Sequence, residues 1–295
     1  MAFQPPRGTR RSTSRNRVKY RPPLLLAVLA AIGLLLFVLP LIGLLARAPW
    51  TRLVDLLTEE VVTDALRLSL VTSLAATAVS GLIGVPLAWV IARVPFRGRS
   101  LVRGIVTLPL VLPPVVGGAA LLFALGRRGL VGEPLNEATG ILLPFSIWGV
   151  IVANVFVAMP FLVNTVESAF RNLDLRFEGA AASLGAGRWT VLRRVTLPMI
   201  GPSLAAGLVL SWARALGEFG ATITFAGNLQ GRTQTLPLAV FVALESDRDT
   251  AIALSLVMVA VSLTVLVALR DRWWKALYYS PCPSPVLRPG SPIRC

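Results

Sequence analysis

Six long apolar stretches, each almost free of charged residues, limit what this chain can fold into. About 20 consecutive apolar residues cross the hydrocarbon core of a bilayer as an α-helix, whereas a spanning β-strand needs only about ten residues of alternating polarity. The composition agrees with helices in a bilayer, because 55% of the 295 residues are hydrophobic and only 15% are charged. The chain is therefore predicted to be an all-α integral membrane protein. The six expected transmembrane helices cover about residues 22–46, 65–92, 104–126, 141–167, 196–218 and 250–269.

The basic residues indicate on which side of the membrane each loop lies. Cytoplasmic loops carry an excess of Lys and Arg. Most of the arginines lie in residues 1–21, 93–103, 171–198 and 270–295, and most acidic residues lie in the remaining loops. Both termini are therefore expected in the cytoplasm. The predicted organisation is a disordered basic arm at 1–21, a transmembrane domain at 22–272 and a disordered tail at 273–295.

The third apolar stretch contains a motif that disfavours a continuous helix. Its central part reads LPLVLPPVVGG, with Pro109, Pro113 and Pro114 inside the stretch. Each proline removes a backbone donor and clashes with the preceding helical turn, so this helix is expected to be broken or kinked. The break either faces protein or a water-lined cavity, or it is a tolerated kink without function. Several glycines are expected to allow close helix packing: Gly81, Gly84, Gly117, Gly118 and Gly207.

Two charged residues stand at the end of the fifth stretch. Arg214 and Glu218 are four residues apart, so a helix would place them on one face and allow them to pair. Charges within or at the edge of a membrane span are costly and often mark a solute pathway. The alternative is a structural ion pair near the outer interface.

Several function classes find no support in the sequence. It contains no G-x-x-x-x-G-K-[ST] phosphate loop and no histidine, which argues against a nucleotide hydrolase, a His-based catalyst and a His metal site. We therefore expect no enzymatic activity and no bound cofactor. The net charge of +15 comes from arginines that flank the apolar stretches, so a nucleic-acid partner is not expected.

The 171–198 loop contains a short segment that can form a helix. Glu178–Gly185 is rich in small side chains, which would let a partner approach closely, and Gly185 or Gly187 could end the helix in a left-handed cap. Leu197 and Pro198 then open the fifth stretch, where a proline is acceptable near a helix start. A small helical knob on the cytoplasmic side is one interpretation, and a plain surface loop is the other.

The loop resembles the E-A-A-x-x-x-G-x9-I-x-L-P motif of ABC importer permeases. One position departs from the motif, since Gly179 stands where the family has Glu and Glu178 precedes it by one residue. The stretches LPLVLPPVVGG and RALGEFGATITFAGN are similar to the molybdate/tungstate branch of these permeases. The matching residues of the loop are Ala180, Ala181, Gly185, Val195, Leu197 and Pro198.

The resemblance implies a type I importer permease in the bacterial plasma membrane. It implies a homodimer, a separate cytoplasmic ATPase dimer that binds ATP and Mg, and a periplasmic or lipid-anchored oxyanion-binding protein. The residues expected to contact the ATPase are Glu178, Gly179, Ala180, Ala181, Gly185, Leu197 and Pro198. The residues expected along the solute path are Arg214, Glu218, Thr222, Thr224 and Asn228. The rival interpretations are a sulfate or thiosulfate permease and, from another class, an ATP-independent channel or a signalling scaffold.

Overall fold

The computed structural model describes residues 23–278, and this part of the chain is helical without β-strands. The predictions for the arm at 1–21 and for residues 279–295 of the tail lie outside the described residues. The chain divides into two units, Met1–Arg47 and Ala48–Cys295. The described part of the first unit is α1 (Leu24–Ala46), a helix without buried side chains. The second unit contains the remaining elements.

The second unit begins with a short helix and then the first of its long ones. Its helices are α2 (Leu53–Thr58), α3 (Glu60–Arg93), α4 (Arg99–Val111), α5 (Pro114–Leu125), α6 (Gly132–Thr139), α7 (Ile147–Asn172), α8 (Leu175–Ser183), α9 (Arg188–Val191), a π-helical turn (Leu192–Thr196), α10 (Leu197–Leu216), α11 (Gly220–Phe225), α12 (Leu236–Ser246) and α13 (Arg248–Tyr278). The last helix extends past residue 272, so it includes the first residues of the expected tail.

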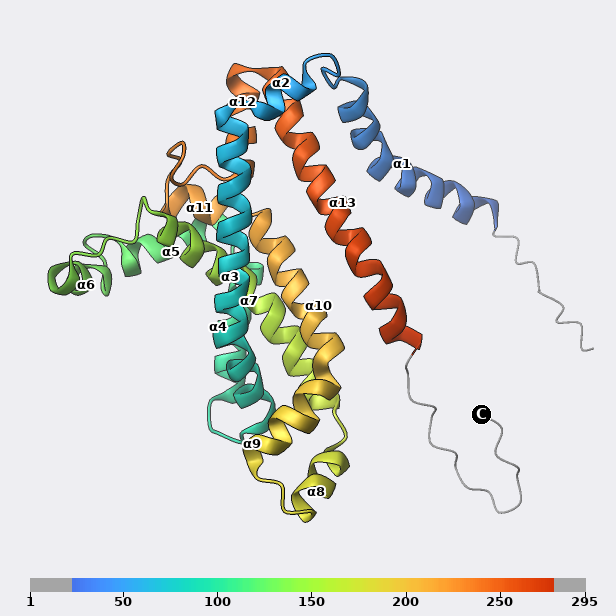
Figure 1. The fold of residues 1–295 in the computed structure, drawn as a ribbon, viewed down its shortest axis with the longest axis vertical. Coiled ribbons are helices and arrows are strands. Elements are labelled where there is room, and N and C mark those ends of the chain that lie inside the picture. The colour runs from blue at the N-terminus through green and yellow to red at the C-terminus, as the bar shows by residue number, and fades with distance from the viewer. Residues whose placement is uncertain (1–22, 279–295) are drawn as a thin grey trace, which may run out of the picture. The chain divides into compact units, whose positions relative to one another are not determined.

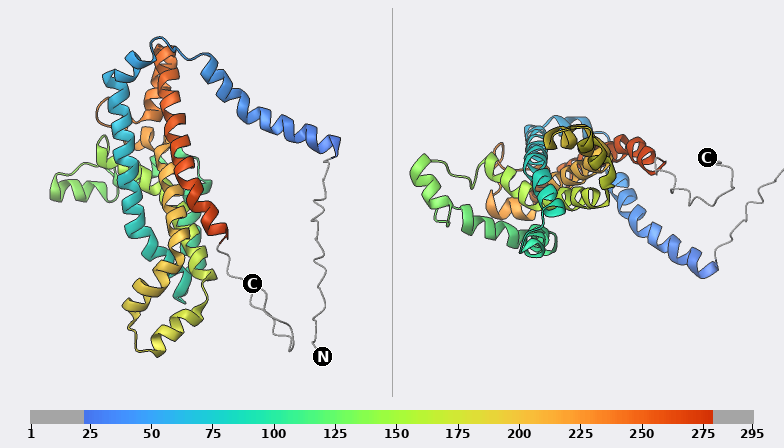
Figure 2. Two further views of the ribbon diagram at one scale, coloured as in Figure 1. Left: turned by 45° about the vertical axis from the view of Figure 1, so that its right-hand side comes forward. Right: turned by 90° about the horizontal axis from the view of Figure 1, so that it is seen from below.

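The core of the second unit is formed by α3, α7 and α10, which pack along one another (Figure 1 and Figure 2). Small residues make this packing close. A Cβ added at Gly207 of α10 would lie 2.9 Å from the Leu162 side chain of α7, and one at Gly84 of α3 would lie 3.2 Å from Val163. Trp212 of α10 also donates a hydrogen bond to Ser73 of α3 at 2.9 Å. The predicted role of these glycines in helix packing is confirmed.

The predicted break in the third apolar stretch is also confirmed. The helix α4 ends at Val111 and α5 begins at Pro114. Leu112 and Pro113 between them have extended backbones, with ψ angles of 136° and 131°. Pro113 and Pro114 cannot donate hydrogen bonds to the preceding turn, so the chain ends one helix and starts another with Pro114 at a permitted first position.

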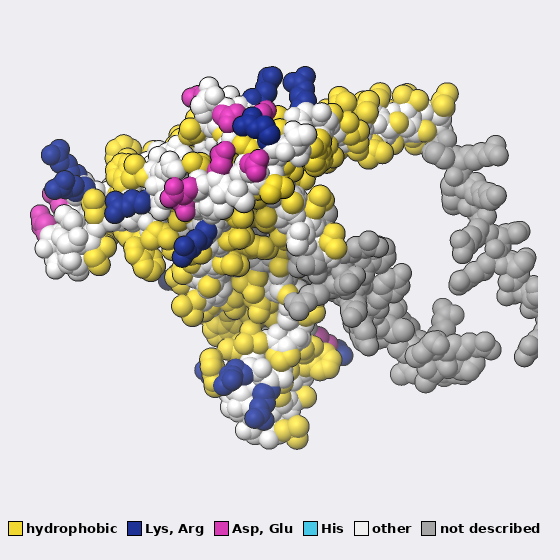
Figure 3. Space-filling view, turned by 45° about the horizontal axis from the view of Figure 1, so that its top comes forward, with side chains coloured by type: hydrophobic (Ala, Val, Ile, Leu, Met, Phe, Trp, Pro, Cys, Tyr) yellow, Lys and Arg dark blue, Asp and Glu magenta, His cyan; other side chains and the backbone are white. Residues whose placement is uncertain are grey.

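Five described helices are long and apolar enough to cross a membrane, namely α1, α3, α7, the continuous helix 188–216 and α13. The remaining expected span, the third, is the broken pair of α4 and α5, in which each helix is shorter. Figure 3 shows hydrophobic side chains over the body of the molecule, with several acidic side chains toward the end that carries α2 and α12 and basic side chains at both ends. The fold is thus all-helical with a membrane-compatible surface.

The segment between α10 and α13 is more ordered than the hydropathy pattern indicates. Within it, α11 is buried beside α5 and α7, and the shorter apolar helix α12 packs on α3 and α13. The backbone N–H of Leu236 at the start of α12 donates to the Ser69 hydroxyl of α3 at 2.6 Å. The polar group on α3 therefore satisfies a donor that the helix itself leaves free.

Candidate functional site

The knob predicted between the fourth and fifth spans is the helix α8. The Asp174 carboxylate caps its start by accepting from the Arg176 N–H at 2.9 Å. At its end the Ala186 N–H donates to Ala181 O and the Gly185 N–H donates to Ala182 O. These two bonds form a Schellman motif. Gly185 has the left-handed φ of +84° that this motif requires, so Gly185, and not Gly187, ends the helix.

The Glu178 carboxylate ties α8 to two other elements. Its Oε1 accepts from Arg93 Nη2 at 3.1 Å and from the Thr196 hydroxyl at 2.9 Å. Arg93 is the last residue of α3, and Thr196 is the buried last residue of the π-helical turn before α10. One carboxylate thus connects α8 with the ends of two long core helices. The sequence analysis identified neither residue, because Arg93 lies outside the loop motif and Thr196 stands at a position where the motif specifies no residue.

The opposite face of α8 is open to solvent and unusually apolar. Gly179 and Ala180 are exposed, and a Cβ added at Gly179 would meet nothing within 4 Å. Leu184 is 90% exposed and Trp189 of α9 is 67% exposed. On the side of α8 that carries Glu178, a hollow of about 650 Å³ lies between α8, α9 and Trp89 of α3. Exposed apolar groups of this kind beside small residues are typical of a docking surface for another protein.

The chain from α9 into α10 is a continuous helix with an irregular turn. Pro198 has no N–H to donate to the carbonyl of Arg194, and the turn from Leu192 to Thr196 just before it is π-helical. Single π-helical turns inside helices frequently accompany functional sites. Leu197 and Pro198 therefore lie where the α8–α9 segment joins the core helix α10.

The second predicted group of residues surrounds the turn between α10 and α11. Arg214 Nη1 lies 2.5 Å from Glu218 Oε2, so the predicted ion pair is formed. The Glu218 side chain is only 1% exposed, and its Oε1 accepts from the Ala221 N–H at 2.7 Å. A carboxylate at the start of a helix satisfies a free donor there. Glu218 thus stabilises the turn between α10 and α11.

Thr222, Thr224 and Asn228 lie on α11 and just after it. Thr222 is fully buried, and its hydroxyl has no hydrogen-bond partner among the described residues. The Asn228 side-chain oxygen is also buried without a partner there. Thr224 donates to the carbonyl of Gly220 at 2.8 Å. The structure therefore places these residues close together in the chain with Thr222 buried and the other two partly buried, and Thr222 and Asn228 retain hydrogen-bonding capacity.

The position of α11 depends on two glycines at its contact with α5. A Cβ added at Gly118 would lie 2.8 Å from Ala221 O, and one at Gly220 would lie 2.8 Å from the Pro114 side chain. The backbones of α5 and α11 therefore approach more closely than any larger residue would permit. The break at Pro113 and the buried segment after Glu218 lie side by side.

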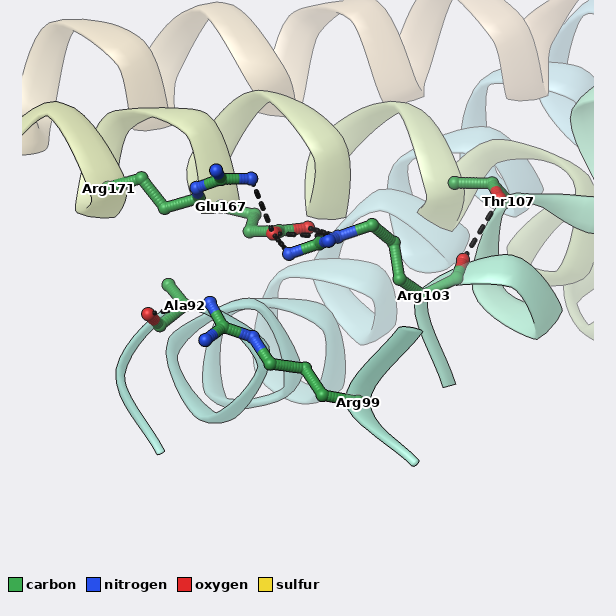
Figure 4. Close-up of polar contacts among 6 residues, drawn as sticks. All are labelled: Ala92, Arg99, Arg103, Thr107, Glu167 and Arg171. Atoms are coloured by element: carbon green, nitrogen blue, oxygen red, sulfur yellow. Dashed lines mark hydrogen bonds and ion pairs between the residues drawn. The ribbon is translucent and has the colours of Figure 1, made fainter. Parts of the chain in front are cut away.

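A further buried carboxylate lies at the end of the core near α8. Glu167 of α7 is buried and accepts from Arg103 of α4, whose Nε donates to Oε1 at 3.0 Å and whose Nη2 donates to the same oxygen. Arg171 Nη1 lies 3.8 Å from that oxygen (Figure 4). Figure 4 also shows Arg99, which donates to the carbonyl of Ala92 at 3.0 Å. Glu167 therefore connects α7 to α4 through Arg103.

The chain is similar to curated permease proteins over most of its length. It is 46% identical to the molybdenum transport system permease protein ModB of Mycobacterium tuberculosis over 245 residues, 82% of this chain and 92% of that protein. It is 40% identical to ModB of Escherichia coli K12 over 71% of this chain and 92% of that protein. It is 36% identical to the sulfate transport system permease protein CysT of Escherichia coli K12 over 80% of this chain and 86% of that protein.

A solved structure has the same fold. It is the crystal structure of a bacterial alginate ABC transporter in complex with an alginate pentasaccharide-bound periplasmic protein. The match has a TM-score of 0.68 and 23% identity, and covers 83% of this chain and 91% of that chain. The similarity extends to a protein family described as "Binding-protein-dependent transport system inner membrane component", which matches residues 84–278. The resemblance to importer permeases is thus confirmed, and this multi-pass plasma-membrane protein belongs to the binding-protein-dependent transport system inner membrane component family.

Proposed function

We propose that this chain is the membrane-spanning permease subunit of an ATP-driven importer of molybdate or tungstate. The observation that carries the proposal is the 40–46% identity to ModB proteins over most of the chain. The identity to the sulfate permease CysT is lower, at 36%. Two copies of the chain form the pathway with six spans each and with both termini in the cytoplasm. A separate binding protein delivers the oxyanion from outside.

The structure of α8 supports coupling to a separate ATPase dimer. Its exposed small and apolar residues provide a surface for docking, while Glu178 connects its inner side to α3 and to the start of α10. A displacement of α8 is therefore transmitted to core helices as a rigid-body movement. ATP and Mg are bound by the ATPase, and this chain supplies no hydrolytic group.

The α5–α11 contact supports a route for the oxyanion. A desolvated dianion requires hydrogen-bond donors, and the buried hydroxyl of Thr222 is available for this purpose. The amide of Asn228 lies just after the same helix, whereas the Thr224 hydroxyl would have to leave the Gly220 carbonyl to donate to the oxyanion. Arg214 is half-buried and paired with Glu218, so this pair adds hydrogen-bond donors but no net positive charge.

The function is tested by uptake of radiolabelled molybdate in cells that lack this chain and in cells that express it again. Uptake must depend on the chain, on the companion ATPase and on the binding protein. Persistence of chain-dependent uptake after deletion of the ATPase would contradict the importer and support an ATP-independent channel. The control is the chain with Glu137→Ala, an exposed acidic residue of α6.

A sulfate permease is the second candidate, because CysT is 36% identical over 239 residues. The two candidates predict different effects of unlabelled sulfate on the uptake of radiolabelled molybdate. A 100-fold excess of unlabelled sulfate is expected to leave molybdate uptake almost unchanged, whereas unlabelled tungstate is expected to abolish it. Loss of uptake with sulfate would assign the chain to sulfate transport.

A further inference from the structure

Three arginines line a hollow that the proposed transport function does not use. The hollow has a volume of about 410 Å³ and lies at the start of α4. Its arginines are Arg99 and Arg103 of α4 and Arg171 at the end of α7 (Figure 4). The hydroxyl-bearing residue Ser100, the aromatic residue Phe96 and Gly98 complete its lining.

The hollow keeps an excess of positive charge after its internal pairs are considered. Glu167 is the carboxylate that pairs with these arginines, and it is bonded directly to Arg103. Arg171 is 3.8 Å from Glu167 and its side chain is 56% exposed. Arg99 is bonded to a neutral carbonyl, so its charge is not compensated there. Two guanidinium groups thus remain available for an anion, and guanidinium groups bind phosphate oxygens particularly well.

An apolar groove continues from this hollow along α4. It has a volume of about 430 Å³, shares Ser100 with the hollow and is lined by Leu101, Ile105 and Leu108. These three side chains are 66%, 60% and 51% exposed. Their spacing of four and three residues places them on one face of the helix. Charged and apolar surfaces therefore meet at Ser100.

We propose that this composite surface binds one anionic phospholipid, with its phosphate among Arg99, Arg103 and Arg171 and an acyl chain along Leu101, Ile105 and Leu108. The charge complementarity selects an anionic headgroup, as basic pockets between membrane helices do. The adjoining groove selects a lipid over a free oxyanion, because a free oxyanion has no apolar part to bury. A second copy of the chain on this face would bring two positively charged hollows together, which is unfavourable.

The bound lipid would connect α4 to α7 across the Arg103–Glu167 pair. This end of the molecule also carries Arg93 and α8. An anionic lipid would therefore stabilise the region where α3 and α7 end and α4 begins. The proposal is independent of which oxyanion is transported.

The test is native mass spectrometry of the full-length permease with phosphatidylglycerol and with phosphatidylcholine of the same acyl chains. One phosphatidylglycerol molecule per chain is expected to bind about tenfold more tightly than phosphatidylcholine, a factor that corresponds to about 1.4 kcal/mol. The double variant Arg99→Gln with Arg171→Gln is expected to abolish this preference. The single variant Arg171→Gln, which breaks only the 3.8 Å contact, serves as the test if the double variant does not fold. It is expected to weaken the preference for phosphatidylglycerol.

The matched control is Arg128→Gln, which removes one exposed positive charge beyond α5 and is expected to keep the preference. Equal binding of the two lipids, or an unchanged preference in both arginine variants, would overturn the proposal. In a final competition measurement, glycerol 3-phosphate or free molybdate is added to the permease with bound phosphatidylglycerol. Displacement of the lipid by either at equimolar concentration would identify a free-anion site instead.

Discussion

Arg93 and Glu178, which are 85 residues apart in the sequence, form an ion pair of 3.1 Å between the end of α3 and the helix α8. Thr196 donates to the same carboxylate oxygen at 2.9 Å. Glu178 therefore faces the protein, although the loop motif alone suggested an outward contact with the ATPase. Its position one residue before the family glutamate places it on the inner side of α8.

Removal of the Glu178 carboxylate is expected to loosen α8. Hydrogen bonds to a charged group contribute about 1.5–3 kcal/mol each. Glu178→Ala should therefore increase hydrogen exchange of the α8 amides by about tenfold or more and reduce oxyanion uptake. Thr196→Val should show part of this effect, since it keeps the Arg93 contact. Unchanged exchange in Glu178→Ala would show that the two bonds do not hold the helix.

The left-handed conformation of Gly185 is expected to limit substitution there. An L-residue in this conformation costs about 1–2 kcal/mol, so Gly185→Ala should destabilise the end of α8, and Gly185→Asn should do so less. No atom lies within 4 Å of the added Cβ, so the effect is conformational. Gly187→Ala is the control, because Gly187 has a φ of −66° and equal space. The measurement is hydrogen exchange of residues 180–186, and equal rates in the two alanine variants would refute the argument.

The close contact between α5 and α11 is expected to exclude any side chain at Gly118. An added Cβ would lie 2.8 Å from the backbone oxygen of Ala221, which cannot move without displacing α11. Overpacking typically costs about 1–3 kcal/mol, so Gly118→Ala should lower the thermal unfolding midpoint of the purified protein. Gly201→Ala on α10, where nothing lies within 4 Å, should not lower it. A midpoint equal to that of the control would mean that the two helices can separate without cost.

Arg103 is expected to be the more important of the two arginines that contact the buried Glu167. Removing the partner of a buried charge costs about 3–5 kcal/mol, because that charge is left unpaired. Arg103→Ala, which leaves the buried Glu167 carboxylate without its hydrogen bonds, should therefore reduce folded yield strongly, whereas Arg171→Ala should have a small effect, since Arg171 is largely exposed and 3.8 Å away. Thermal unfolding of both variants in detergent gives the comparison. The reverse order would show that Arg171, not Arg103, is the principal partner.

The start of α13 is expected to become less stable in acid. The hydrogen bonds from the Thr250 hydroxyl and from the Asp249 N–H lower the pKa of Asp247. A lowered pKa in the folded state means that the stabilisation is present above the unfolded pKa of about 3.9 and is lost as the pH falls through the folded value. Asp247→Asn keeps an acceptor that does not titrate. The difference in unfolding midpoint between wild type and Asp247→Asn should therefore change below about pH 4, and a difference independent of pH would contradict this assignment.

Hydropathy, proline positions and small residues were sufficient to predict the helical membrane fold, a broken or kinked third span and the glycine-mediated packing. They left open whether Glu178–Gly185 forms a helix, and whether Gly185 or Gly187 ends it. The predicted features depend on residues close together in the chain, so a local pattern contains them. The Arg214–Glu218 pair was predicted for the same reason, since its members are one helical turn apart. The functional roles assigned to these residues remain predictions.

The sequence by itself determined which segments prefer a bilayer and where their helices must stop. The free energy of transfer to lipid is a sum over single residues, and the backbone restrictions of proline and glycine act at single positions. Only the tertiary structure decided that Glu178 meets Arg93 and Thr196, that Glu167 meets Arg103, and that α11 is buried against α5. Such pairings join distant parts of the chain. They arise from the packing of whole helices, and no spacing within the sequence specifies which distant charge or glycine will face which partner.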